Sequence, residues 1–587
     1  MTTDTSGVDA RVESLLGRLG LRERAALMFH PVLTIGPGGS IADFDPRADR
    51  PGARELIVER GLSHFNVVGT ASAGDLARWH NALQDLAGAT ASGMPVTLSS
   101  DPRHAFADNP GTAIPAGAFS QWPEPLGFGA LRDADAAYEF GCAVRREYSA
   151  VGIRVALHPQ LDLATEPRWA RLNGTYGDDP ALVGEIAASY IHGLQGNRFG
   201  VGSVAAMVKH FPGGGPQKDG EDPHFAYGRE QVYPTHNWEA HLAPFRQALD
   251  AGARQVMPYY GMPIGSPWDE VGFGFNRPVI EGLLRKELGF DGIVCADWGI
   301  ISDSTFLGHP FPARAWGVEH LSPIDRMHRA LDAGVDQFGG EACPELIVEL
   351  VETGRVGAER IDASARRVLR EKVLLGLFDE ERYVDPGHAQ EVVGSPDLVA
   401  AGRRAQSRAV TLLKNSPADA CAARPTLPLD RDARLFVQGL DPEVAAAYAH
   451  VVSDPEQADY AIVRLQSPYD PRGIGTFEEF FHTGRLHFDE ETVQSLRRIA
   501  AVTRLVAVVH LERPPILGDI TELAYALAFD YGSSDAALLD ALFGTVKPVG
   551  RLPVGLPKSV QAVERHPSDA PLQGEEVLYP RGAGLDV

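Results

Sequence analysis

The chain has 587 residues, which is too long for one ordinary domain, so we expect at least two domains. Hydrophobic residues make up 44% of the chain and charged residues 22%, which is typical of a globular protein with large cores. The formal net charge of −24 disfavours nucleic-acid and membrane-surface partners, because phosphate groups repel such a surface.

The first part of the chain alternates short apolar strands with helical patterns. Strands are predicted at residues 25–33, 64–68, 95–99, 154–157, 204–208, 254–258, 292–296 and 335–338. Helical patterns between them include residues 73–86, 180–194 and 238–251. This alternation predicts a mainly parallel α/β sheet, and about eight such units suit a (β/α)8-type barrel over residues 1–385. An open, doubly wound sheet is the alternative.

A second domain is expected after a short connection. A helix is predicted at residues 358–375, and a polar stretch containing Pro and Gly indicates a linker at 386–400. Another helix near 397–408 leads into the second domain, residues 401–587. Its predicted strands are 434–438, 460–465, 505–509 and 527–529. Helices between these strands favour a C-terminal α/β sandwich domain.

The cysteines and the first residues bear on the cellular compartment. Cys142, Cys295, Cys343 and Cys421 are far apart and show no CxxC spacing, so neither a zinc site nor a disulfide scaffold is expected. The opening MTTDTSG has neither the basic region nor the apolar region of a secretory signal. No apolar run reaches about 18 residues, the length that a membrane span needs. We therefore expect a cytoplasmic protein.

Polar and aromatic side chains follow several consecutive predicted strands. They are Asp101, Arg171, Lys209, His210, Tyr260, Asp297 and Trp298. Taken singly, each has a structural interpretation: Arg171 could form a surface ion pair, His210 could be a core histidine, and Asp297 could cap the next helix. Because the carboxyl ends of barrel strands meet on one face, however, the whole set would converge there. Carboxylates, cations and aromatic rings together indicate a sugar-binding subsite.

Seven segments, in order, resemble motifs of glycoside hydrolase family 3. They are EPRWAR at 166–171, KHFPG at 209–213, VMPYY at 256–260, GIVCADW at 292–298, GVD at 334–336, AVTLLKN at 409–415 and GRLPV at 550–554. Their order and spacing are similar to the family's from about residue 10 to the C-terminus.

The resemblance implies a retaining, exo-acting β-glycosidase, most similar to the β-glucosidases, in which Asp297 forms a covalent glycosyl-enzyme. It implies that the sugar is held by Asp101, Arg171, Lys209, His210, Tyr260 and Trp298. No metal or organic cofactor is implied. The expected partner is a small β-glycoside or oligosaccharide, and a homodimer is the assembly considered.

No complete sequence motif identifies the acid/base residue. In many two-domain relatives it is a Glu on a loop of the second domain. Counting back from residues 486–488 places Glu478 there, with Glu479 beside it, while counting forward from the preceding strand places Asp470. An exposed helical turn is the structural interpretation of Glu478 and Glu479. The N-acetylglucosaminidases of the family use an Asp-x-His pair instead, and Asp222-Pro223-His224 has that spacing.

Three other functions stay open at this point. A β-xylosidase would use the same residues, and an N-acetylglucosaminidase or a phosphorylase would use His224. A sugar-binding protein without catalytic activity on the same fold is the alternative from a different class.

Overall fold

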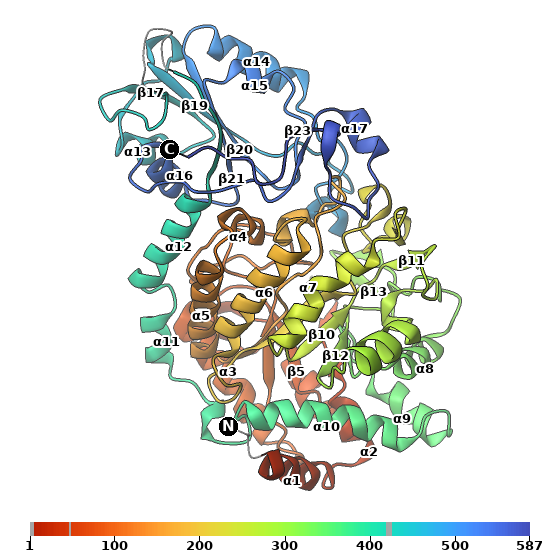
Figure 1. Cartoon of the computed structure of the whole chain (residues 1–587). Helices are drawn as coiled ribbons and strands as arrows, with labels where there is room; N and C mark the ends of the chain where they lie inside the picture. The colour runs from red at the N-terminus through yellow and green to blue at the C-terminus, as the bar shows by residue number, and fades with distance from the viewer. Residues whose placement is uncertain (1–4, 46–48, 418–424, 587) are drawn as a thin grey trace.

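The computed structural model describes residues 5–45, 49–417 and 425–586, so Cys421 lies outside the described residues. The first domain is built on one parallel sheet (Figure 1). Its strands are β1 (Phe29–His30), β2 (Val32–Thr34), β5 (His64–Val68), β6 (Thr97–Ser100), β7 (Ile153–Ala156), β8 (Ala205–Phe211), β10 (Gln255–Pro258), β12 (Ile293–Ala296) and β15 (Gln337–Gly339).

The sheet closes through one interrupted strand. β1 pairs with β15 at one end of the strand order, and β2 pairs with β5 at the other. Only Pro31, which has no N–H to donate, separates β1 from β2. The two ends of the sheet therefore meet, which confirms the predicted barrel and excludes the open sheet.

Helices surround the barrel between its strands (Figure 1). They include α3 (Ala73–Gly88), α5 (Ala134–Ala150), α6 (Pro180–Gln195), α7 (Trp238–Asp250), α8 (Pro323–Ala333) and α10 (Ala358–Leu374). α6 shows why such helices begin and end where they do. Asp179 caps its first turn, Pro180 occupies the first helical position, and Gly196 ends it with a positive φ.

The first strand prediction began too early. Residues 25 and 26 belong to a helix, α2 (Leu21–Ala26), because Glu23 accepts a hydrogen bond from the Gly20 N–H and caps the helix start. Ala25 and Ala26 are buried on a face of this helix, so their apolar character reflects helix packing.

The second domain is a six-stranded sheet covered on both faces. Its strands are β16 (Thr411–Asn415), β17 (Arg434–Gln438), β18 (His450–Val451), β19 (Tyr460–Leu465), β20 (Arg504–His510) and β21 (Ala526–Asp530). β16 is antiparallel to β21, and the other neighbours pair in parallel. Side chains alternate: Val463 joins the core that includes α14 (Glu490–Ala500), and Ile462 joins the core of α16 (Asp535–Leu542). The predicted α/β sandwich is confirmed.

The connection between the domains is helical. The segment expected to be a linker, 386–400, holds α11 (Pro386–Val392) and the beginning of α12 (Pro396–Ala409). α12 runs from the side of the barrel to the second domain (Figure 1). It is fastened to the barrel by Gln406, which donates to the Gln121 carbonyl at 2.8 Å, and by an ion pair of Arg408 with Asp133 at 2.9 Å. The domain limits themselves stay a prediction.

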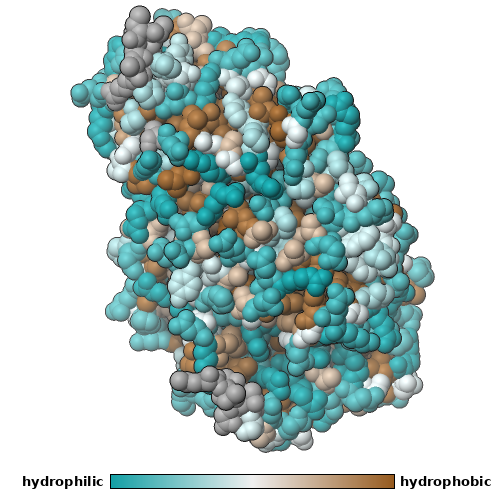
Figure 2. Space-filling view, viewed as in Figure 1, coloured by the Kyte–Doolittle hydropathy of each residue, from teal (hydrophilic) through white to brown (hydrophobic). Residues whose placement is uncertain are grey.

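The face drawn in Figure 2 is mostly hydrophilic, and its apolar residues lie in separate small groups. On that face no continuous apolar patch marks a docking surface. Among the described residues, no helix is both long enough and apolar enough to cross a bilayer.

Asp569 fastens the last part of the chain to the barrel. Its buried carboxylate accepts hydrogen bonds from the Thr235 N–H, the Thr235 hydroxyl and the Asn237 N–H, at 3.0 to 3.2 Å. These donors directly precede α7, whose N-terminus favours a negative charge.

We expect Asp569→Ala to lower the free energy of unfolding by about 2–4 kcal/mol, because it leaves several buried donors without an acceptor. Urea or thermal unfolding measures this loss. Asp586→Ala is the control, because the Asp586 side chain is 85% exposed in its ion pair with Arg551 and its removal should cost less than about 0.5 kcal/mol. Equal losses in the two variants would contradict the importance of the Asp569 contacts.

Candidate active site

Asp297 directly follows β12 at the carboxyl end of the barrel. One carboxylate oxygen, Oδ1, accepts the N–H of Trp298 at 2.8 Å. The other, Oδ2, is buried and makes no hydrogen bond within the described part of the chain. The next helix, α8, begins only at Pro323 and is capped by Ser322, so Asp297 is not a helix cap. The site therefore presents one fixed and one unengaged oxygen.

The backbone beyond Asp297 is held by two side chains. The carbonyl of Trp298 accepts the Tyr260 hydroxyl at 2.7 Å and Nε of Arg314 at 3.1 Å, and Nη2 of Arg314 contacts the same oxygen. The Arg314 guanidinium also lies over the Tyr260 ring, 5.6 Å from its centre. The predicted residues Tyr260 and Trp298 thus help to fix the orientation of Asp297.

His210 connects two charged groups. Its Nδ1 lies 2.7 Å from Oδ2 of Asp162, and its Nε2 lies 2.9 Å from Nη2 of Arg171. Since arginine can only donate, Nε2 accepts and Nδ1 carries the proton. Burial and the Arg171 charge lower the pKa of His210 well below its ordinary value, which agrees with a neutral ring. Both ring nitrogens are engaged, so here His210 orients Arg171.

Arg171 is the buried cation of the site. Its Nε and Nη1 are buried and without partners in the described chain, so they are available to a ligand. Burial alone would lower the pKa of Arg171, but Tyr259, Asp222 and Asp297 hold it above its ordinary value. The guanidinium therefore stays charged beside the nucleophile candidate.

Lys209 and Asp101 form a buried ion pair at the carboxyl ends of β8 and β6. The distance from Lys209 Nζ to Asp101 Oδ1 is 2.9 Å, and both side chains are almost fully buried. The second oxygen of Asp101 accepts a hydrogen bond from Asn66. Four of the predicted sugar-binding groups, Asp101, Arg171, Lys209 and His210, thus lie on neighbouring strands or the loops that follow them.

The Asp222–His224 pair lies in the same site. Nδ1 of His224 is 2.6 Å from Oδ1 of Asp222, and Trp169 Nε1 donates to Oδ2 of Asp222 at 3.0 Å. Burial opposes ionisation of Asp222, but His224 and Arg171 hold its pKa down at about 2. Burial lowers the pKa of His224, although the charges of Asp222 and Asp297 act in the opposite direction. His224 is therefore electrostatically coupled to Asp297.

The acidic candidates of the second domain lie on the loop that follows β19. Glu478 is half-buried and accepts the Tyr227 hydroxyl, and Glu479 is exposed and accepts the Gly475 N–H at 2.8 Å. Asp470 accepts the Arg485 N–H at 2.8 Å and so stabilises its own loop. On the same loop, Phe477 and Phe481 pack on the His224 ring, at 5.7 and 5.0 Å between ring centres.

A cavity of about 670 Å3 opens between the two domains. Its lining includes Arg171, Lys209, His158, Tyr469, Glu479, His482, His510 and Glu512. Asp297 does not line it, but Arg171 and Lys209 belong both to its wall and to the group around Asp297. The rings of Tyr469 and His482 stack at 3.9 Å, which gives the cavity a flat aromatic surface. The volume suits a ligand of one or a few sugar units.

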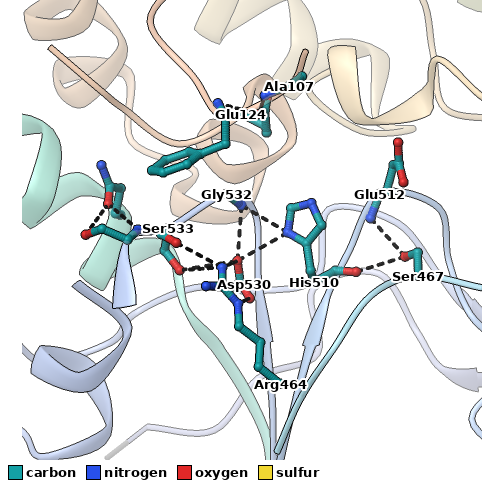
Figure 3. Close-up of polar contacts among 12 residues, drawn as sticks. Ala107, Glu124, Arg464, Ser467, His510, Glu512, Asp530, Gly532 and Ser533 are labelled. Carbon is teal, nitrogen blue, oxygen red and sulfur yellow. Dashed lines mark hydrogen bonds and ion pairs between the residues drawn. The ribbon is translucent and has the colours of Figure 1, made fainter. Parts of the chain in front are cut away.

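Polar residues of the second domain close one side of this cavity (Figure 3). Arg464, His510 and Asp530 converge from the carboxyl ends of β19, β20 and β21. His510 Nδ1 lies 3.2 Å from Asp530 Oδ1, and Arg464 Nη2 lies 2.8 Å from the same oxygen. Burial opposes ionisation of Asp530, but His510 and Arg464 hold its pKa at about 2. Burial alone would lower the pKa of His510, but Asp530 holds it above its ordinary value.

A raised folded pKa means that His510 stabilises the fold most when it is protonated. This stabilisation is complete at pH values below the unfolded-state pKa of about 6.5, and it is lost as the pH rises through the raised pKa of the folded state. We therefore expect His510→Gln to lower the free energy of unfolding by about 1–2 kcal/mol at pH 5.5, and by less at pH 9. Urea unfolding at both pH values measures the difference.

His450→Gln is the control for this measurement, because His450 is exposed on the edge strand β18. Its effect should be small at both pH values. A His510→Gln loss that grows with pH would contradict the charged pair.

Several residues of the site were not predicted as site residues. Asp162 comes shortly after β7, Asn66 is a polar residue within the apolar run of β5, and both positions were detectable signals. Asp222 was noted only as the partner of His224. Arg314 lies in a loop whose sequence carries no recognisable pattern.

Comparison with known families gives two matches that together cover most of the chain. Residues 70–371 match the glycosyl hydrolase family 3 N-terminal domain, and residues 433–587 match the glycosyl hydrolase family 3 C-terminal domain.

Similar proteins include β-glucosidase C of Emericella nidulans, which is 45% identical over 99% of this chain and 92% of that protein. A periplasmic β-glucosidase/β-xylosidase of Dickeya chrysanthemi is 36% identical over 98% of this chain and 89% of that protein. The crystal structure of a Listeria innocua β-glucosidase with glucose has a TM-score of 0.77 at 20% identity, over 98% of this chain and 83% of that one. At that identity the last likeness concerns the fold alone.

Proposed function

We propose that this chain, which belongs to glycosyl hydrolase family 3 and is a glycoside hydrolase, is a retaining, exo-acting β-glucosidase. The observation that carries the mechanism is the unengaged, buried Oδ2 of Asp297 beside the Arg171 cation. The β-glucoside preference is supported by the relative named β-glucosidase C, at 45% identity over nearly the whole chain.

The reaction has two steps. In the first, Oδ2 of Asp297 bonds to the anomeric carbon while the glycosidic C–O bond breaks, and the departing oxygen takes a proton from the acid/base. In the second, water bonds to the anomeric carbon, gives its proton to the same group, and the bond to Asp297 breaks. Arg171, Lys209 and Asp101 supply the donors and acceptors for the hydroxyl groups of the sugar.

Asp297→Asn should lower kcat/KM for aryl β-glucosides by about 10⁴-fold or more, since the amide is a poor nucleophile. Turnover is measured on aryl β-glucoside, β-xyloside, β-galactoside and β-N-acetylglucosaminide. Asp303→Asn is the control, because Asp303 lies on the nearby loop and accepts the Ala313 N–H. Undiminished turnover in a clean Asp297→Asn preparation would refute the nucleophile assignment.

Two groups compete for the acid/base role. Glu478 is the residue that the sequence predicts. His224 is favoured by its geometry. Its bond to Asp222 leaves Nε2 without a partner among the described residues, and its ring lies 4.9 Å from that of Tyr260, which binds the Trp298 carbonyl next to Asp297. If His224 is the acid, activity should fall as pH rises through its pKa, which burial places below the ordinary value of 6.5.

Glu478→Gln and His224→Gln separate these candidates. Loss of the true acid/base should lower kcat/KM by about 10²–10⁴-fold for a disaccharide. The loss should be much smaller for a dinitrophenyl glucoside, whose leaving group needs no proton. Azide should restore turnover of that substrate, because it attacks the glycosyl-enzyme without a general base. The variant that shows both effects identifies the residue, and a variant that shows neither is excluded.

A β-xylosidase is the second candidate, supported by the relative named for both activities. The aryl glycoside panel distinguishes the two. For the ligand we propose a small β-glycoside or oligosaccharide, in keeping with the polar and aromatic cavity between the domains. A cytoplasmic location, a homodimer and the absence of a cofactor stay predictions.

A further inference from the structure

Asn66 is a buried hydrogen-bond partner of the Asp101 carboxylate. It lies on β5, its side chain is buried, and its Nδ2 donates to Oδ2 of Asp101 at 2.9 Å. Lys209 Nζ binds the other oxygen, Oδ1, at the same distance. Each oxygen of Asp101 therefore receives one donor from inside the barrel. Since a carboxylate oxygen has two lone pairs, each keeps one for a ligand.

Ser99 lies on the other side of Asn66. Its hydroxyl is 3.5 Å from Oδ1 of Asn66, 3.3 Å from the Phe65 carbonyl and 2.8 Å from Nε2 of His30. A flipped amide would place Oδ1 against the Asp101 carboxylate, where two acceptors repel. The ring of His30 in turn lies 5.4 Å from that of Trp298, beside the nucleophile candidate. Contacts between buried side chains therefore extend from Asn66 through Ser99 and His30 to Trp298.

We propose that Asn66 is a positioning residue for recognition of the sugar, which holds Asp101 so that both of its oxygens accept hydroxyl groups of the glycone. This inference rests on the proposed function, in which Asp101 touches the sugar. With Asn66 absent, Lys209 alone would orient the carboxylate, and a terminal carboxylate rotates over a broad range. The long, flexible side chain of Lys209 restricts the orientation of the carboxylate less than the short, buried amide of Asn66 does.

The choice of an amide has a chemical reason. Asn66 adds a donor without adding charge, so Lys209 stays the direct ion-pair partner of Asp101. Arg103 from the loop after β6 also attracts the Asp101 charge, and the Tyr148 hydroxyl donates to the Asp101 carbonyl at 3.2 Å. Burial lowers the pKa of His30 to about 3 and raises that of Tyr148. Neither ring therefore changes its charge between pH 5 and pH 7.

Asn66→Asp tests the inference, because it keeps the side-chain shape and replaces the amide donor by a carboxyl group. Two adjacent carboxyl groups share a proton below the raised pKa of the pair, and above that pKa two carboxylates face and repel each other. When protonated, the new carboxyl group donates to Asp101 as the amide does. We expect kcat/KM for an aryl β-glucoside to fall on the order of 10²-fold at pH 7, and the ratio to wild type to recover at least fivefold at pH 5.

Asn81→Asp is the matched control. Asn81 lies on α3, is partly buried, and donates through Nδ2 to the Val384 carbonyl at 2.8 Å, far from any residue of the site. The same chemical change there should lower the thermal unfolding midpoint without changing the shape of the pH profile of kcat/KM. Asn66→Leu removes the donor without adding an acid, so its loss should persist at both pH values.

Glucose binding by calorimetry at pH 5 and pH 7 makes the test independent of turnover. The affinity of Asn66→Asp for glucose should be weaker than that of the wild type at pH 7 and recover at pH 5. Such recovery in a protein that hydrolyses no glycoside would support the inference and refute the proposed function. Activity and glucose affinity that change in neither Asn66→Asp nor Asn66→Leu would overturn the inference. If Asn66→Asp does not fold, an undiminished glucose affinity in Asn66→Leu would overturn it.

Discussion

The burial of one positive charge, that of Arg171, organises the whole site. A guanidinium removed from water needs negative or accepting neighbours, and here these are Asp222, Asp297 and the neutral ring of His210. His210 can accept from Arg171 only because Asp162 takes the proton of its other nitrogen. Two of the guanidinium nitrogens of Arg171, Nε and Nη1, have no partner among the described residues, so the cation that attracts the acidic groups can also bind a polar ligand.

The barrel was predictable because its strands are short apolar segments that recur between helices, and several of them lead directly into a polar or glycine residue. The strands at Tyr460–Leu465 and Arg434–Gln438 were located to the residue. The errors occurred where an apolar pattern fits two structures: Ala25 and Ala26 are buried in a helix, not in a strand. The expected linker at 386–400 is largely helical, since Pro386 and Pro396 begin α11 and α12 there.

Site residues at strand ends were predictable, because the fold brings those ends together wherever the chain continues afterwards. Residues that reach the site from a loop were not predictable in this way. Arg314 reaches the Trp298 carbonyl from the loop before α8, and no periodicity in the sequence predicts the path of that loop. The acid/base illustrates the same limit: Glu478 and His224 both satisfied a spacing rule, and only the three-dimensional path of their loops separates the Tyr227 contact of one from the Asp222 contact of the other.

The contacts of the last residues have a consequence for biosynthesis. Asp569 and Arg581 bind barrel residues that were translated more than three hundred residues earlier. Because domains fold largely as they leave the ribosome, the barrel, which is complete at the end of α10, is exposed without these partners until residue 569 has been added. The cavity wall supplied by β19, β20 and β21 also arrives late. Closure of the interdomain cavity is therefore among the final events in the making of this chain, and a prematurely terminated product would carry an open barrel face.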